Sequence, residues 1–104
     1  MFNSISKLFG SDTTDFNKLV KEGAIILDVR TNKEFYNGHI EGAINIAVDE
    51  LIQELNQLKD KNKPIITYCA SGNRSAKAKK ILETSGYTNV YDGGGYHSLI
   101  NKIQ

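Results

Sequence analysis

Short runs of apolar residues recur along the chain and predict its β-strands. The runs AIILDV and PIITY are continuous rather than alternating, and this pattern is typical of strands that are buried on both faces. Two further runs, AINI and NVYD, predict shorter strands. The four predicted strands cover residues 24–29, 43–46, 64–68 and 89–92. One more strand near the N-terminus would give a sheet of five.

Apolar residues at helical spacing lie between these runs and predict helices. A first stripe begins at Phe16 and ends at Gly23, and Thr31 and Glu34 have the spacing of a capping box that would start one brief helical turn. Glycines 93–95 predict a tight turn rather than a phosphate-binding loop, because the lysine of such a loop is missing. The remaining predicted helices cover residues 49–58, 74–85 and 96–103.

The alternation of strands and helices predicts the fold class. Such an order favours an α/β fold in which a parallel sheet of four to five strands is flanked by helices on both faces. The 104 residues suit a single domain, 1–104, with a core over about 12–104 and an N-terminal extension over 1–11. Apolar residues at near-helical spacing in this extension predict either a helix that docks on a partner or membrane surface, or a flap over the domain's own core. The small apolar area favours the flap.

The composition excludes several functional classes. Hydrophobic residues make up 39% of the chain, charged residues make up 24%, and the formal net charge is +1, so no bulk field for nucleic acid is expected. No apolar run is long enough for a signal peptide or a membrane span. The one cysteine cannot form an internal disulfide, which is compatible with a reducing compartment. We therefore expect a cytoplasmic protein.

The chemistry of the chain is predicted to centre on Cys69. This residue follows a buried strand and precedes a helix, and ligands of open parallel sheets gather at the carboxyl ends of strands. Gly72 permits a sharp turn, after which the loop amides can point at the sulfur. The helix N-terminus and the cation of Arg74 favour a thiolate, the nucleophilic form. The alternative is a buried structural cysteine that packs as a small hydrophobe.

The motifs around Cys69 and upstream of it resemble those of the rhodanese-like (sulfurtransferase) family. The resemblance extends from about Ile25 to Leu99 and includes DVRTNKEFYNGHIEGAINI at 28–46 and CASGNRS at 69–75. The closing motif of the family is present only in part, since Leu99 stands where tryptophan is frequent. This departure concerns packing more than chemistry.

The resemblance implies a cysteine that takes up a sulfane sulfur as a persulfide and passes it on. Cys69 would carry the sulfur, received from thiosulfate or another persulfide donor, and a thiol, cyanide or a protein would accept it. Two half-reactions that share a covalent intermediate predict ping-pong kinetics. Arg74 would bind the anionic donor or orient the loop. The amides that would stabilise the terminal sulfur belong to Ala70, Ser71, Gly72, Asn73 and Ser75. The resemblance requires no metal and no cofactor, and we expect a monomer.

Other polar residues near the predicted strand ends have weaker assignments. Asp28 and Arg30 lie at the end of the neighbouring strand, where they either pair and brace the active loop or form an ion pair that only ends the strand. For His39 we favour a hydrogen bond between its imidazole and the backbone over a role as general base. His97 has no supporting motif.

Two other functions compete with sulfur transfer. Related folds use a cysteine and an arginine to attack phosphate, but five residues separate the pair in that pattern, whereas four separate Cys69 from Arg74. This narrower loop favours sulfur over a phosphatase or arsenate reductase. The second alternative is a regulatory binding module or persulfide carrier without efficient thiosulfate turnover. It is suggested by Arg74 being the only charged residue of the loop.

Overall fold

Four parallel strands form the sheet of the computed structural model, which describes residues 14–104. The strands are β1 (Ile25–Asp28), β2 (Ile44–Asn45), β3 (Ile65–Cys69) and β4 (Val90–Gly95). Their order is β2-β1-β3-β4, and each neighbouring pair is parallel. All four predicted strands are confirmed. The N-terminal extension and any strand within residues 1–13 lie outside the described residues.

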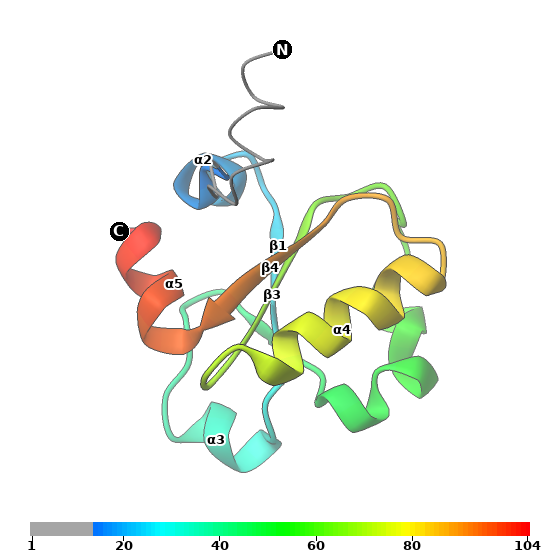
Figure 1. Ribbon diagram of the computed structural model, residues 1–104, viewed down its shortest axis with the longest axis horizontal. Helices are drawn as coiled ribbons and strands as arrows, with labels where there is room; N and C mark the ends of the chain where they lie inside the picture. Colours follow the sequence, from blue (N-terminus) through cyan, green and yellow to red (C-terminus); the bar gives the residue numbers. More distant parts are fainter. Residues whose placement is uncertain (1–13) are drawn as a thin grey trace.

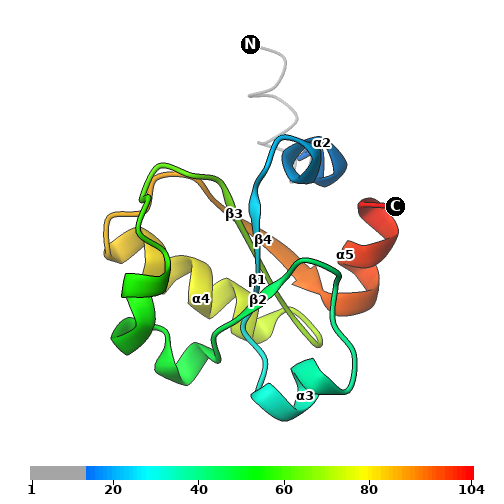
Figure 2. The ribbon, with the colours of Figure 1, turned by 180° about the vertical axis from the view of Figure 1, so that it is seen from behind.

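Helices cover both faces of this sheet, as the sequence predicted (Figures 1 and 2). One face carries α2 (Phe16–Lys21) and α5 (Tyr96–Lys102), and the other carries α4 (Asn73–Thr84) with two short 3₁₀ helices. Each face has its own apolar core, with Leu27 and Leu82 in one and Ile66 and Leu99 in the other. The short helix α3 (Asn32–Tyr36) lies beyond the carboxyl ends of the strands.

The α-helix predicted after Asp49 is wrong, because residues 48–57 form the 3₁₀ helices η1 (Val48–Glu50) and η2 (Ile52–Gln57). Asp49 lies inside η1 and does not cap it, and the backbone kinks at Glu54. A 3₁₀ helix turns more tightly than an α-helix. Leu51 and Leu58 still face the core, whereas Ile52 does not. Leu51 is fully buried while its neighbour Ile52 remains 63% exposed.

The tight turn predicted at glycines 93–95 is also wrong, because all three glycines belong to β4. Close packing explains why glycine stands in this strand. A Cβ atom on Gly93 would lie 2.8 Å from the carbonyl oxygen of Thr67 and 2.9 Å from side-chain atoms of Ile66 and Leu99. Gly95 pairs with Cys69, and the register between β3 and β4 shifts between Thr67 and Cys69. Gly93 therefore lets β3 and α5 approach β4 closely.

Within residues 14–104, none of the helices has both the length and the apolar character that a membrane span requires.

Gly93→Ala is predicted to destabilise the fold by about 2 kcal/mol, because the added methyl group overpacks the contact between β3 and β4. The free energy of unfolding in urea measures this loss. Gly42→Ala is the matched control, since it adds the same methyl to open space. Its cost of about 1 kcal/mol comes only from the positive φ of Gly42. Wild-type stability of Gly93→Ala would contradict the packing argument.

Candidate active site

Cys69 is the last residue of β3 and lies at the carboxyl edge of the sheet, where the chain turns into α4 (Figure 1). Its side chain belongs to the core facing α4, and the residue is only 1% exposed. The exposed residues Ala70 and Ser71 form the turn, and Asn73 is the first residue of α4. The sequence thus located the cysteine correctly at a strand end, while the structure buries it almost completely.

Backbone amides point at the sulfur of Cys69. The amides of Gly72 and Ser75 donate hydrogen bonds to Sγ, with nitrogen–sulfur distances of 3.0 and 3.3 Å. Gly72 makes this arrangement possible, because its φ of +108° is a left-handed conformation that side chains disfavour. These two amides, which we call the amide cradle, are two of the five that the family resemblance implies.

The cradle lowers the pKa of the Cys69 thiol. Burial alone raises this pKa, but hydrogen bonding from Ser75, above all through its amide, and from the amides of Gly72 and Ser71 outweighs it. Each of these donors stabilises the thiolate more than the thiol. The geometry therefore favours the nucleophilic form of the sulfur.

Asp92 links the first turn of α4 to strand β4 through hydrogen bonds. The Ser75 hydroxyl donates to Asp92 Oδ1 over 2.7 Å, and the amide of Gly94 donates to the same oxygen over 2.9 Å. Thr67 of β3 adds a hydrogen bond from its hydroxyl to the Ser75 carbonyl, 3.0 Å long. Sequence reasoning missed Asp92, although its place near the end of a parallel strand was a usable signal.

Arg74 forms an ion pair that the sequence analysis did not anticipate. Its Nη1 and Nη2 atoms lie 2.7 and 3.0 Å from the two carboxylate oxygens of Glu34. Glu34 also completes the predicted capping box of α3 with Thr31, and that box is confirmed. The guanidinium that was expected to meet a donor thus already faces a carboxylate.

Asp28 and Arg30 pair in the interior, next to the strand that carries Cys69. Arg30 Nη2 lies 2.7 Å from Asp28 Oδ2, and a second bond from Nη2 reaches the carbonyl of Gly38. The Tyr68 hydroxyl donates to Asp28 Oδ2 over 2.7 Å and accepts from the amide of Ile40 over 3.0 Å. The pairing is as predicted, but the pair contacts Tyr68 and the segment 38–40 and makes no bond to the loop 70–75.

Burial and charge fix the protonation states of this network. Burial raises the pKa of Tyr68, which keeps its hydroxyl neutral. The hydrogen bond to Asp28 raises the pKa of Arg30, so the guanidinium stays charged although it is buried. Arg30 also lies over the ring of Tyr96, 4.8 Å from its centroid. The site is thus bordered by a buried, charged guanidinium that is hydrogen-bonded to Asp28.

His39 has the backbone hydrogen bond that the sequence analysis favoured. Its Nδ1 lies 2.8 Å from the carbonyl oxygen of Phe35, which assigns the proton to Nδ1. The imidazole also stacks on the Phe35 ring, with 3.7 Å between centroids. These contacts hold the loop that follows α3.

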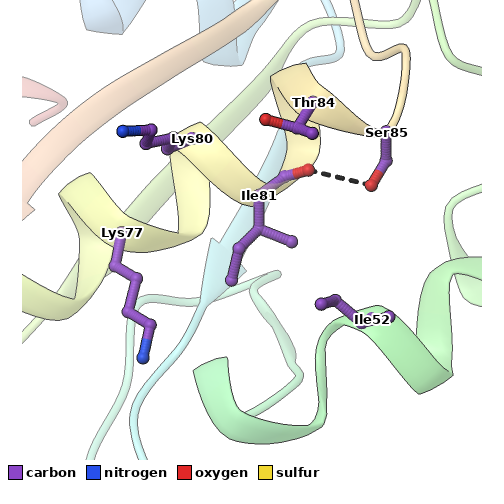
Figure 3. Close-up of a pocket in the computed structure, with 6 residues that line it drawn as sticks. All are labelled: Ile52, Lys77, Lys80, Ile81, Thr84 and Ser85. Atoms are coloured by element: carbon purple, nitrogen blue, oxygen red, sulfur yellow. Dashed lines mark hydrogen bonds between the residues drawn. The ribbon is translucent and has the colours of Figure 1, made fainter.

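A separate groove of about 310 Å³ lies between α4 and η2 (Figure 3). Ile81 and Ile52 face each other across it, and Lys77 and Lys80 border it on the side of α4. No residue of the Cys69 loop lines this groove. It therefore does not shape the surroundings of the sulfur.

Comparison with known proteins identifies the family. The model of the Rhodanese-like domain matches residues 12–100. The chain belongs to this family. Among its relatives is the thiosulfate sulfurtransferase PspE of Escherichia coli, which is 39% identical over 74 residues that cover 70% of this chain and 71% of PspE.

Solved structures and larger relatives support the same fold. The human single-domain sulfurtransferase TSTD1 superposes with a TM-score of 0.75 at 27% identity, over 86% of this chain and 92% of that one. A tRNA uridine(34) hydroxylase of Buchnera aphidicola is 34% identical over 72% of this chain, which spans only 26% of that protein. The rhodanese-like domain therefore occurs both nearly alone and within larger proteins.

Thiolate absorbance is predicted to titrate with a half-point below about pH 8.5, the value of an unperturbed cysteine. Absorbance rises as the thiol loses its proton, so a lowered pKa moves the rise to lower pH. The measurement is the ultraviolet difference between wild type and Cys69→Ser across pH, which cancels the tyrosines. In denaturant the half-point should return to about 8.5. Identical half-points in native and denatured protein would contradict the amide argument.

Tyr68→Phe is predicted to cost about 2 kcal/mol of stability, because it leaves the buried amide of Ile40 without an acceptor. Urea unfolding measures the loss. Tyr36→Phe removes the same hydroxyl from a residue that is 82% exposed, and should change stability by about 0.5 kcal/mol or less. Equal effects of the two substitutions would argue against the network.

Proposed function

We propose that this protein is a sulfurtransferase that moves a sulfane sulfur through a persulfide on Cys69. The observation that carries the proposal is the pair of amide hydrogen bonds to Sγ, from Gly72 and Ser75. They stabilise an anionic sulfur at the carboxyl edge of the sheet, where substrates of such folds bind. Membership of the rhodanese-like family and the similarity to PspE support the same reaction class.

The first half-reaction loads the cysteine. The Cys69 thiolate attacks the outer sulfur of the donor, a new S–S bond forms, and the S–S bond of the donor breaks. Sulfite leaves when the donor is thiosulfate, and a thiolate leaves when the donor is a persulfide. The negative charge of the product rests on the terminal sulfur, where the loop amides and the N-terminus of α4 favour it.

The second half-reaction unloads the cysteine. A thiol, cyanide or the thiol of a protein attacks the terminal sulfur, and its bond to Cys69 breaks. The electron pair of that bond returns to Cys69, and the amides of Gly72 and Ser75 again stabilise the thiolate. Because each half-reaction starts from a stable form of the protein, the kinetics follow a ping-pong scheme.

Cys69→Ser is predicted to abolish sulfur loading, because the alcohol is not an effective nucleophile at neutral pH. Intact mass spectrometry before and after treatment with thiosulfate or a persulfide detects the added sulfur atom, and peptide mapping locates it. Circular dichroism confirms that the serine variant is folded.

Two outcomes would refute the proposal. One is a sulfur adduct that persists in Cys69→Ser, which would place the sulfur elsewhere. The other is a wild-type protein that neither donor loads. Hydrolysis of p-nitrophenyl phosphate by that unloaded protein would then indicate a phosphatase.

A further inference from the structure

The positive charge of Arg74 is paired with the carboxylate of Glu34 in the absence of any donor. Two nitrogens of its guanidinium meet two oxygens of the Glu34 carboxylate, at 2.7 and 3.0 Å. Each of the two side chains is only about one-third exposed, at 35% for Arg74 and 34% for Glu34. A two-point contact of this kind fixes the orientation of both groups as well as their distance.

Glu34 is held in place independently of Arg74. The amide and the hydroxyl of Thr31 both donate to Glu34 Oε1, at 3.0 and 3.1 Å. The hydrogen bond from Arg74 and these two bonds lower the pKa of Glu34 to about 2. The carboxylate is therefore charged and positioned throughout the neutral range, so the ion pair needs no rearrangement to form.

The charges around Cys69 leave little to attract a dianion. Arg74 directly precedes Ser75, whose amide bonds to Sγ. The pKa of Arg74 is raised first by its bond to Glu34 and also by the charge of Cys69. Arg30, the other guanidinium at this edge, is paired with Asp28. Lys77, the next cation along α4, lines the separate groove of Figure 3.

We propose that Glu34 determines donor specificity at this site by withholding the guanidinium of Arg74 from anionic donors. The loop then favours persulfides of low net charge over thiosulfate, which must compete with Glu34 for Arg74. This inference rests on the proposed sulfur transfer through Cys69. With a persulfide RSS⁻, the Cys69 thiolate attacks the outer sulfur, the donor's S–S bond breaks, RS⁻ leaves, and the total charge is unchanged.

Glu34→Gln tests the proposal without removing the start of α3. A capping box accepts glutamine in the place of glutamate, so the bonds with Thr31 can persist while the negative charge is lost. Urea unfolding checks that the variant is folded. Mass spectrometry measures the second-order rate constant for loading Cys69 with each of three donors. They are thiosulfate (charge −2), methanethiosulfonate (−1) and cysteamine persulfide (net zero).

The gain in loading rate is expected to grow with the negative charge of the donor. The attraction between a released Arg74 and the donor is proportional to the donor's charge, so it is twice as large for a dianion as for a monoanion. Because rate depends exponentially on energy, the fold-increase in loading rate for a dianion is the square of that for a monoanion. Ion pairs that are one-third exposed are weak, so we expect about threefold for methanethiosulfonate and about tenfold for thiosulfate. Cysteamine persulfide should change by less than about twofold. A gain of equal size for all three donors would overturn the proposal.

Two further variants separate the proposed role from simpler effects. Glu83→Gln removes an exposed carboxylate from the far end of α4 and should leave all three rates unchanged. Arg74→Gln should slow loading by thiosulfate, and in that background Glu34→Gln should raise the thiosulfate rate by less than about threefold. A full tenfold gain without Arg74 would mean that Glu34 acts by simple repulsion, and it would overturn the withholding role.

The same measurements distinguish this inference from the proposed function. If no donor loads wild-type Cys69, sulfur transfer itself is refuted. If all three donors load the protein and Glu34→Gln leaves their relative rates unchanged, sulfur transfer stands and the role of Glu34 is refuted.

Discussion

The buried ion pair of Asp28 and Arg30 is the constraint on which the carboxyl edge of the sheet depends. Two opposite charges in the interior are tolerated only when they face each other and their remaining hydrogen-bonding groups are satisfied. Tyr68 and the carbonyl of Gly38 meet that requirement here. Asp28 and Tyr68 are also register partners in β1 and β3, so the pair joins the two central strands where they end. The strands β1, β3 and β4 end at this edge, and the helices α3, α4 and α5 begin just beyond it.

The cradle around the sulfur is built mainly from backbone, and this explains how it tolerates different loop side chains. The two hydrogen bonds to Sγ need only the left-handed turn at Gly72 and the first turn of α4. Ala70, Ser71 and Asn73 are exposed, so their side chains face solvent and can vary without disturbing the amides. The loop sequence therefore influences which molecules approach, while the fold supplies the stabilisation of the anion.

The sequence was sufficient where local patterns determine the structure. Continuous apolar runs located the strands, the spacing of Thr31 and Glu34 located the start of α3, and the place of Cys69 between strand and helix located the cradle. Sequence patterns were insufficient where contacts between residues far apart in the chain determine the structure. Glycine is a poor strand former, so nothing local shows that Gly93 must lie in β4, beneath Leu99. Residues 34 and 74 are forty positions apart, and no periodicity links them.

The near-complete burial of Cys69 has a consequence for how its thiol resists oxidation. Oxidants attack exposed thiolates most readily. The buried Sγ, without an added sulfur, is therefore protected from overoxidation even though its pKa is lowered. An added sulfur lengthens the side chain by about 2 Å, the length of an S–S bond. In the proposed persulfide, the sulfur that reacts would therefore be one bond removed from the buried Sγ. Burial of Sγ and reactivity of the transferred sulfur would then belong to two different atoms.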